Sequence, residues 1–330
     1  MREIRKDEYS VLKVIMTVSV VAAHVARMYS FDGGAIAMPV NRLLDFIMVF
    51  IYEFHMPVFV FVSGAVFSRC LMNGKYKDVK RFVVNKAKRL LVPYFLFGIF
   101  YVTPVMVLLG ITDLGVKRYI VEGILCDMNS RHLWYLYALF LMLVLTRTAQ
   151  PFLDRHPTAI YLLLGFFTCL ACRYWIVPEA FGIMHVAKFY CYFLLGYIFD
   201  RNKDVLDKQT AKYWWLSIFG FLVIACIALF TREEALRVMA GFIGILSCYA
   251  VTIKTQKYFW ETKLYGIILE NSMGIYLFHP MIIYVLFYIG QDYPISPYAF
   301  SCLVFAAASI LSYWFTRIVK DCKLGFLLGE

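Results

Sequence analysis

The hydrophobic residues of this chain fall into ten continuous runs of about 18 to 25 residues, the length at which an α-helix crosses a lipid bilayer. Strands of a membrane β-barrel would instead alternate apolar and polar residues over about ten positions. The pattern therefore predicts an all-α polytopic membrane protein of about ten transmembrane helices. The runs cover residues 11–30, 43–67, 90–110, 133–149, 158–177, 183–199, 213–230, 236–253, 264–290 and 297–316. Because the connections are short, residues 1–330 are expected to form a single domain.

Composition and charge agree with a membrane location. Hydrophobic residues make up 62% of the 330 residues and charged residues only 17%, a balance that excludes an ordinary soluble globular domain. With the N-terminus inside, 23 of the 33 lysines and arginines fall in cytoplasmic segments, which predicts that both termini are cytoplasmic. The net charge of +11 then reflects anchoring on an anionic inner leaflet and does not require nucleic acid. We expect a multi-pass protein of a bacterial inner or plasma membrane.

The cysteines and the N-terminus suggest no further class of protein. The nine cysteines are scattered, mostly within apolar runs, and do not form a disulfide framework. Cys169 and Cys172 have a CxxC spacing but no second ligand pair nearby, so no metal site is expected. The N-terminal stretch imitates a secretory signal, yet its long apolar run contains Lys13 and His24. It is expected to be a retained first helix.

Lys13 and His24 are the most informative pair in the sequence. They lie eleven residues apart in one apolar run, and at about 100° per residue a helix brings both to the same face, about 16 Å apart along its axis. Ionisable groups at membrane depth usually face the bundle interior or a watery cavity. The spacing therefore predicts a functional stripe on the first helix.

The second run combines a predicted kink with further polar residues. Glu53, His55 and Pro57 lie within five residues in the middle of the run, and the proline is expected to bend the helix near Glu53. Further on, Ser63 and Gly64 offer a hydroxyl and a close-packing position, and simple helix packing explains this pair equally well.

Two later segments add candidates. The ninth run places His279 before Pro280 near mid-membrane and Glu270 toward the cytoplasm. The HLWYL segment at 132–136 lies at the outer boundary, where the aromatic belt of membrane proteins already explains its aromatic residues. Only Trp134 is kept from it as a candidate.

Sorting these residues by depth indicates a reaction site between two compartments. No nucleotide-binding glycine loop, zinc-protease helix or serine-nucleophile motif is present in the sequence. A cytoplasmic group of polar residues suits the phosphates of an acyl-CoA, and a deeper group could take a proton from an attacking hydroxyl, with Glu53 orienting His24. The cytoplasmic group is Lys13, Ser63, Lys86, Lys88, Arg89 and Glu270, and the deeper group is His24, Glu53, His55 and His279.

Several segments taken together resemble the integral-membrane acyltransferase 3 family, and within it the fucose 4-O-acetylase-like subgroup. The resemblance covers nearly the whole chain in order. It implies transfer of acetyl or another short acyl group from cytosolic acyl-CoA to a hydroxyl of a sugar or envelope glycan. The segments are the Lys13–His24 spacing, FHMPVFVFVSG at 54–64, KAKRLLVPY at 86–94, HLWYL at 132–136, YCYFLLGYIF at 190–199 and SMGIYLFHP at 272–280.

The resemblance also implies roles for individual residues. His24 corresponds to the family's histidine of the first span and would be the general base or a transient acyl carrier, and Lys13 would contact the donor. Lys86 and Arg89 lie where the family has a paired-arginine pattern, and Lys86 keeps the charge without the bidentate geometry. A branch that acts on peptidoglycan or lipopolysaccharide has an acidic residue where this chain has Leu139. A sugar or exopolysaccharide acceptor is therefore favoured.

The sequence favours an O-acetyltransferase that uses acetyl-CoA and no metal, and two other functions are alternatives to it. A proton-coupled secondary transporter of a sugar or acyl metabolite would use His24, Glu53 and His279 as a proton relay. It would require matching broken helices in the two halves, and only Pro57 and Pro280 hint at such a repeat. A non-catalytic subunit of an export complex would leave the polar stripe unexplained. The sequence indicates no oligomeric state.

Overall fold

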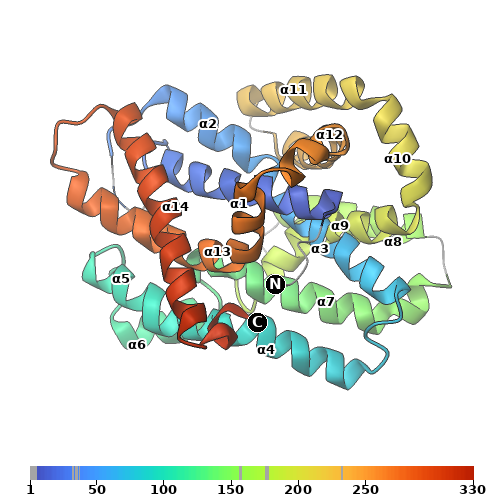
Figure 1. The fold of residues 1–330 in the computed structure, drawn as a ribbon, viewed down its shortest axis with the longest axis horizontal. Helices are drawn as coiled ribbons and strands as arrows, with labels where there is room; N and C mark the ends of the chain where they lie inside the picture. Colours follow the sequence, from blue (N-terminus) through green and yellow to red (C-terminus); the bar gives the residue numbers. More distant parts are fainter. Residues whose placement is uncertain are drawn as a thin grey trace.

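The computed structural model describes residues 6–31, 33, 36, 38–155, 158–174, 178–231 and 233–330, and within these residues it contains helices and no strand (Figure 1). This confirms an all-α protein. The helices are α1 (Glu8–Arg27), α2 (Arg42–Tyr52), α3 (His55–Met72), α4 (Val79–Phe97), α5 (Thr103–Leu108), α6 (Val116–Arg118), α7 (Trp134–Leu153), α8 (Thr158–Tyr174), α9 (Ile183–Arg201), α10 (Lys203–Lys212), α11 (Trp214–Thr231), α12 (Glu234–Trp260), α13 (Lys263–Gly290) and α14 (Pro297–Asp321). Short π or 3₁₀ turns cover Gly98–Val102, Tyr119–Leu125, Arg131–Leu133 and Gly325–Leu328.

The membrane-spanning character of the fold is also confirmed. In the described part of the chain, eight helical segments are long and apolar enough to cross a bilayer, and they coincide with eight of the ten expected spans. The other two expected spans are also helices. One is α8, whose apolar part Ile160–Tyr174 is shorter than the other spans, and the other is α9, which carries Lys188 and Asp200.

Helix α1 lies in the middle of the bundle, where it contacts α2, α3, α12, α13 and α14 (Figure 1). It begins at Asp7, whose carboxylate accepts a hydrogen bond of 2.8 Å from the backbone N–H of Ser10 and so caps the helix. Because neighbours surround α1, its polar residues face the interior of the protein rather than lipid.

Arg69 fixes the first turn of α1 to the rest of the bundle. Its guanidinium lies 3.2 Å from Asp7, 3.0 Å from Glu8 and 2.8 Å from Asp200. These carboxylates come from α1 and α9, whereas Arg69 belongs to α3. One partly buried cation therefore holds three helices together at the end of the bundle where α1 begins.

The predicted kink near Glu53 is confirmed. Helix α2 ends at Tyr52, Glu53 and Phe54 form a turn, and α3 starts at His55 with Pro57 in its first turn. A proline in the first turn loses no helical hydrogen bond, which explains why the interruption comes just before it. Helix α13, in contrast, runs through Pro280 without an interruption.

The tightest contact of the fold lies between α3 and α9. A Cβ atom on Gly64 would come 2.0 Å from the backbone oxygen of Phe193, and a Cβ atom on Gly196 would come 2.0 Å from the backbone oxygen of Phe61. Each helix therefore presses its backbone into a glycine of the other, as small residues allow in membrane helices. The close packing expected at Gly64 is present, and it leaves the side chain of Ser63 on a different face.

We expect Gly64→Ala to destabilise the protein by about 3 kcal/mol or more, because its Cβ meets backbone that cannot rotate away. Thermal unfolding of the detergent-solubilised protein measures this as a lower Tm. The matched control is Gly220→Ala on α11, whose Cβ would meet its nearest neighbour, Ile243, at 3.8 Å. That variant should unfold at or above the wild-type temperature, and equal Tm values for both variants would contradict the packing argument.

Candidate active site

Three cavities follow one another along α1 through the bundle. The first, the Lys13 cavity, has a volume of about 650 Å³, and its lining includes Lys13, Ser63, Lys75, Tyr76, Lys86 and Arg89. The second, the throat, has about 100 Å³, and its lining includes Lys13, Thr17, Ser63, Tyr135, Ser272 and Tyr276. The third, the His24 cavity, has about 440 Å³, and its lining includes His24, His55, Asp127, His132, Trp134 and Lys188.

The three cavities are neighbours that share lining residues. Lys13, Val62 and Ser63 line both the Lys13 cavity and the throat. Val20, Met56 and Tyr276 line both the throat and the His24 cavity. The stripe expected on α1 therefore follows this path, with Lys13 at one end and His24 at the other.

The Lys13 cavity is strongly basic. Lys13, Lys75, Lys86 and Arg89 line it, and none of its described lining residues is Asp or Glu. Tyr76 lies in the loop between α3 and α4, where burial, with a smaller contribution from Cys70, raises its pKa to about 12. Its phenol accordingly stays protonated, and its oxygen accepts a hydrogen bond of 3.2 Å from Lys86 Nζ. Several cations are thus held together without a protein anion, which suits a polyanionic ligand.

The throat contains a pair of hydroxyl groups. Ser63 Oγ lies 3.0 Å from the carbonyl oxygen of Phe59, to which it donates, and 2.8 Å from Tyr135 Oη. Since the proton of Ser63 is used on Phe59, the Tyr135 hydroxyl donates to Ser63. The Ser63 side chain belongs to the cavity path while the adjacent Gly64 belongs to the α3–α9 contact.

At the far end of the path, a backbone carbonyl determines the tautomers of two histidines. His279 Nδ1 lies 2.8 Å from the carbonyl oxygen of Ile275, so this nitrogen must carry the proton and His279 Nε2 must carry a lone pair. His24 Nδ1 lies 2.8 Å from that Nε2 and must therefore donate to it. His24 Nε2 is left unprotonated, which is the form that a general base needs.

Two more histidines of the His24 cavity have their tautomers fixed in the same way. His55 Nδ1 is 2.9 Å from the carbonyl oxygen of Ile51, and His132 Nε2 is 3.2 Å from that of Leu277. Each nitrogen must donate, so the other ring nitrogen carries a lone pair. In His132 this other nitrogen, Nδ1, is buried without a hydrogen-bond partner. The cavity therefore presents acceptor nitrogens to a ligand that brings hydroxyl protons.

Trp134 forms part of the wall of the same cavity. Its ring stacks on His185, with centroids 4.3 Å apart, and on Phe189, with centroids 5.0 Å apart. Both partners belong to α9, one helical turn apart. All three stacked rings line the His24 cavity, beside the histidines.

Three of the residues expected in the site lie away from these cavities. Glu53 does not orient His24, because its carboxylate pairs with Arg237 of α12 at 3.3 Å. Lys88 is exposed on α4, on a different face from Lys86 and Arg89. Glu270 is also exposed, and it is its backbone carbonyl that accepts a hydrogen bond of 2.9 Å from Lys320. His279, in contrast, is fully buried and lies edge to edge with His24, with ring centroids 5.0 Å apart.

Other residues of the His24 cavity were not singled out from the sequence. Asp127, Arg131 and Lys188 come from the segment before α7 and from α9, and only the HLWYL segment pointed toward them, through His132. Asp127 and Arg131 both have positive φ angles, 57° and 56°, a costly backbone conformation that is often found at functional sites. Burial raises the pKa of Asp127, partly offset by hydrogen bonds from Ser130 and from the Tyr94 hydroxyl.

The arrangement thus has cations at one end, a narrow throat in the middle, and neutral imidazole bases with an aromatic surface at the other end. Such a path can hold a phosphate-bearing molecule on one side and deliver its thin reactive arm to a second molecule on the other. Within the described residues, no three His, Cys, Asp or Glu side chains converge as a metal site.

Comparison with known proteins identifies the chain at the level of its family. A search of curated proteins and a search of solved structures each gave no match. The family model described as an acyltransferase domain, of the acyltransferase 3 type, matches residues 7–317, which is nearly the whole chain. Acyl transfer accounts for the two-ended cavity path and takes the place of the transporter and export-subunit alternatives. The protein is a multi-pass membrane acyltransferase and belongs to the acyltransferase 3 family.

Proposed function

We propose that the protein transfers an acetyl or other short acyl group from acyl-CoA to a hydroxyl of a sugar or envelope glycan, with His24 as the general base. The observation that carries the proposal is the series of three neighbouring cavities, with shared lining residues, from the Lys13 cavity through the throat to the His24 cavity. Its two ends differ in chemistry as donor and acceptor sites should.

The donor fits the Lys13 cavity. Acyl-CoA carries a diphosphate and a ribose phosphate at one end and an uncharged arm ending in the thioester at the other. Lys13, Lys86 and Arg89 would bind the phosphates. The throat, at about 100 Å³ the smallest of the three cavities, would hold the arm, so the thioester would reach the neighbourhood of Tyr276 and His24.

The chemical step follows from the tautomer of His24. His24 Nε2 accepts the proton of the acceptor hydroxyl while the hydroxyl oxygen attacks the thioester carbonyl carbon. The carbon–sulfur bond then breaks, and the leaving thiolate of coenzyme A takes the proton from His24. In this step one C–O bond forms and one C–S bond breaks, and the proton passes from the hydroxyl to sulfur. The step requires no metal and no redox partner. His279 serves as a positioning residue, since it holds the His24 ring with Nε2 free.

A sugar fits the His24 cavity on two grounds. The flat surface of Trp134 beside the histidines suits the C–H face of a pyranose ring, and a ring with several hydroxyls can also donate to His132 Nδ1. Leu139 stands where the branch that acts on peptidoglycan has an acidic residue, which favours a sugar or exopolysaccharide acceptor.

The distribution of basic residues supports a cytoplasmic position for the Lys13 cavity, where acyl-CoA is made. Both termini would then be cytoplasmic, and the His24 cavity would open toward the outer side of a bacterial plasma membrane. The enzyme would modify glycans at the outer surface with acyl groups supplied from within.

We expect His24→Ala to lower acetyl-CoA turnover by about 10²- to 10⁴-fold, the usual contribution of a general base, without weakening acetyl-CoA binding. Lys13→Ala should weaken the binding itself. Both are measured on protein purified in nanodiscs, by calorimetric titration with acetyl-CoA and by release of free coenzyme A. Equal loss of binding in both variants would contradict the separation of donor and base.

Arg89 and Lys88 form a matched pair of adjacent cations for testing the donor site. Arg89→Ala should raise the Kd for coenzyme A by about tenfold to a hundredfold, the effect of losing one hydrogen bond to a charged group of about 1.5–3 kcal/mol. Lys88→Ala removes the same charge from an exposed face of α4 and should leave the Kd within about twofold. Equal effects would mean that the Lys13 cavity attracts the donor only through the general charge of the surface.

His279→Phe removes the acceptor for His24 Nδ1 while keeping a ring of similar size, so the His24 ring is no longer fixed with Nε2 free. We expect kcat to fall by roughly tenfold to a hundredfold, as happens when other buried positioning partners are removed. The KM for acetyl-CoA should stay unchanged. His279→Gln, whose side-chain carbonyl can still accept the hydrogen bond, should restore part of kcat; no difference between the two variants would rule out the positioning role.

A further inference from the structure

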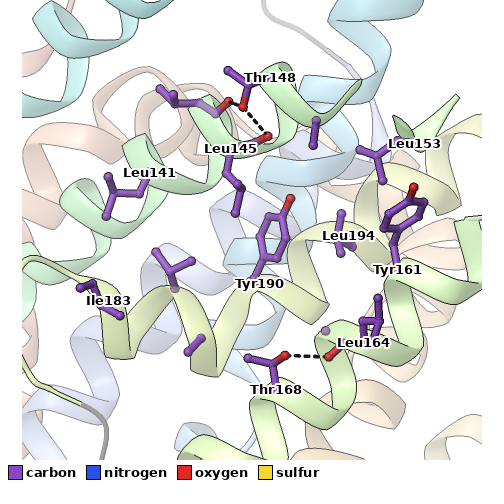
Figure 2. Close-up of a pocket in the computed structure, with 15 residues that line it drawn as sticks. Leu141, Leu145, Thr148, Leu153, Tyr161, Leu164, Thr168, Ile183, Tyr190 and Leu194 are labelled. Atoms are coloured by element: carbon purple, nitrogen blue, oxygen red, sulfur yellow. Dashed lines mark hydrogen bonds between the residues drawn. The ribbon is translucent and has the colours of Figure 1, made fainter. Parts of the chain in front are cut away.

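A further cavity, comparable in volume to the Lys13 cavity, lies outside the path along α1. It is a groove of about 680 Å³ between α7, α8 and α9 (Figure 2). Leu145 and Leu164 on its two sides are exposed, so the groove opens toward the surrounding bilayer rather than into the bundle. Its lining includes Leu141, Leu145, Leu153, Leu164, Ile183 and Leu194.

Three of the hydroxyl groups along the groove, those of Thr148, Thr168 and Tyr190, are turned back to the protein. Thr148 donates to the carbonyl oxygens of Val144 and Leu145 at 3.0 Å, and Thr168 donates to that of Leu164 at 2.8 Å (Figure 2). The Tyr190 hydroxyl lies 3.0 Å from Thr146 Oγ1. The long walls therefore offer hydrocarbon contacts, and a ligand of this groove must itself be a hydrocarbon chain.

Helix α9 is the common wall of the groove and the His24 cavity. Ile183, Ala187 and Tyr190 follow a helical spacing and face the groove. His185 and Phe189 lie on another face of the same two turns and line the His24 cavity. The thickness of one helix thus separates a hydrocarbon-binding surface from the proposed acceptor site.

Where α9 begins, one glycine is packed between a residue of the groove and a residue of the His24 cavity. A Cβ atom on Gly182 would lie 3.3 Å from Leu141 of the groove and 3.4 Å from the Asp127 carboxylate of the His24 cavity. Gly182 adopts a positive φ of 69°, which turns the chain into α9 at this point. A molecule that passes over this end of α9 can have one end in the groove and the other in the cavity.

We propose that the groove between α7, α8 and α9 binds the hydrocarbon chain of an amphipathic acceptor, whose sugar head lies in the His24 cavity. This proposal rests on the proposed function, because it extends the acceptor site. It assigns the acceptor to a class of glycolipids or lipid-linked sugars that reach the enzyme by lateral diffusion in the membrane. The chain enters from the bilayer between α7 and α8 and positions the head by its length.

Alkyl glucosides test the proposal. Acetyl-CoA hydrolysis by the protein in nanodiscs is followed as acetate release, which falls when a sugar head either accepts the acetyl group or blocks water from it. Dodecyl β-glucoside should lower acetate release at a concentration at least tenfold below that needed for methyl β-glucoside. Ala187→Phe fills the groove from α9 and should remove most of this advantage, while acetate release without glucoside stays as in the wild type.

The control is Ala306→Phe, the same substitution at an exposed position of α14, away from the groove. Partition of the dodecyl chain into the bilayer is the same for both variants, so their difference reports the groove alone. Should Ala187→Phe fail to fold, Ala149→Phe fills the groove from α7. Equal responses of the groove and control variants, or no chain-length effect in the wild type, would overturn the proposal. A wild-type protein that releases no acetate would count against the proposed function instead.

Discussion

His24 can act as a base only if the ring nitrogen that faces the cavity carries a lone pair, and the hydrogen bond to His279 decides this. The chain of hydrogen bonds ends at a backbone acceptor, the carbonyl oxygen of Ile275, which no change of side chain can remove. It fixes His279, and His279 in turn fixes His24 at 2.8 Å. Since Ile275 and His279 belong to α13 and His24 to α1, the chemistry depends on how these two helices pack.

Helix α1 lies at the centre of the bundle, so the contact between His24 and His279 is linked to the other residues along the cavities. The same helix that carries His24 carries Lys13 about 16 Å away, so one rigid element sets the distance between the proposed phosphate site and the proposed base. Arg69 holds the first turn of α1, and the glycine contact between α3 and α9 holds the wall opposite it. Substitutions far from His24 can therefore alter the reaction by changing the spacing along the throat.

The periodicity of the sequence predicted which residues share a face of one helix. It predicted contacts between residues of different helices less well. The shared face of Lys13 and His24, the interruption before Pro57 and the close packing at Gly64 all follow from local sequence, and the structure contains each of them. The partner of His24 does not follow from it. Glu53 is only two residues from His55, yet Arg237 on α12 takes its carboxylate.

The acceptor side of the site shows the same limit. Asp127 and Lys188 reach the His24 cavity from segments about sixty residues apart, and no spacing in the sequence connects them. The groove is harder still to foresee, because its residues read as ordinary apolar helix faces. These residues form the proposed binding groove only because α7 and α8 both pack on α9 and leave a space between them.

The absence of Glu53 from the contacts of His24 has a chemical consequence. In a histidine paired with a carboxylate, the imidazolium formed during reaction is stabilised by a full negative charge. Here the partner is a neutral imidazole, so the positive charge formed on His24 is spread toward His279 through the Nδ1–H···Nε2 hydrogen bond and is not balanced by an ion pair. Such a base gains most when the proton leaves quickly, and the thiolate that departs through the throat is the nearest group that can take it. A direct transfer, in which one proton moves from the hydroxyl to His24 and on to sulfur, therefore suits this site better than a long-lived charged intermediate.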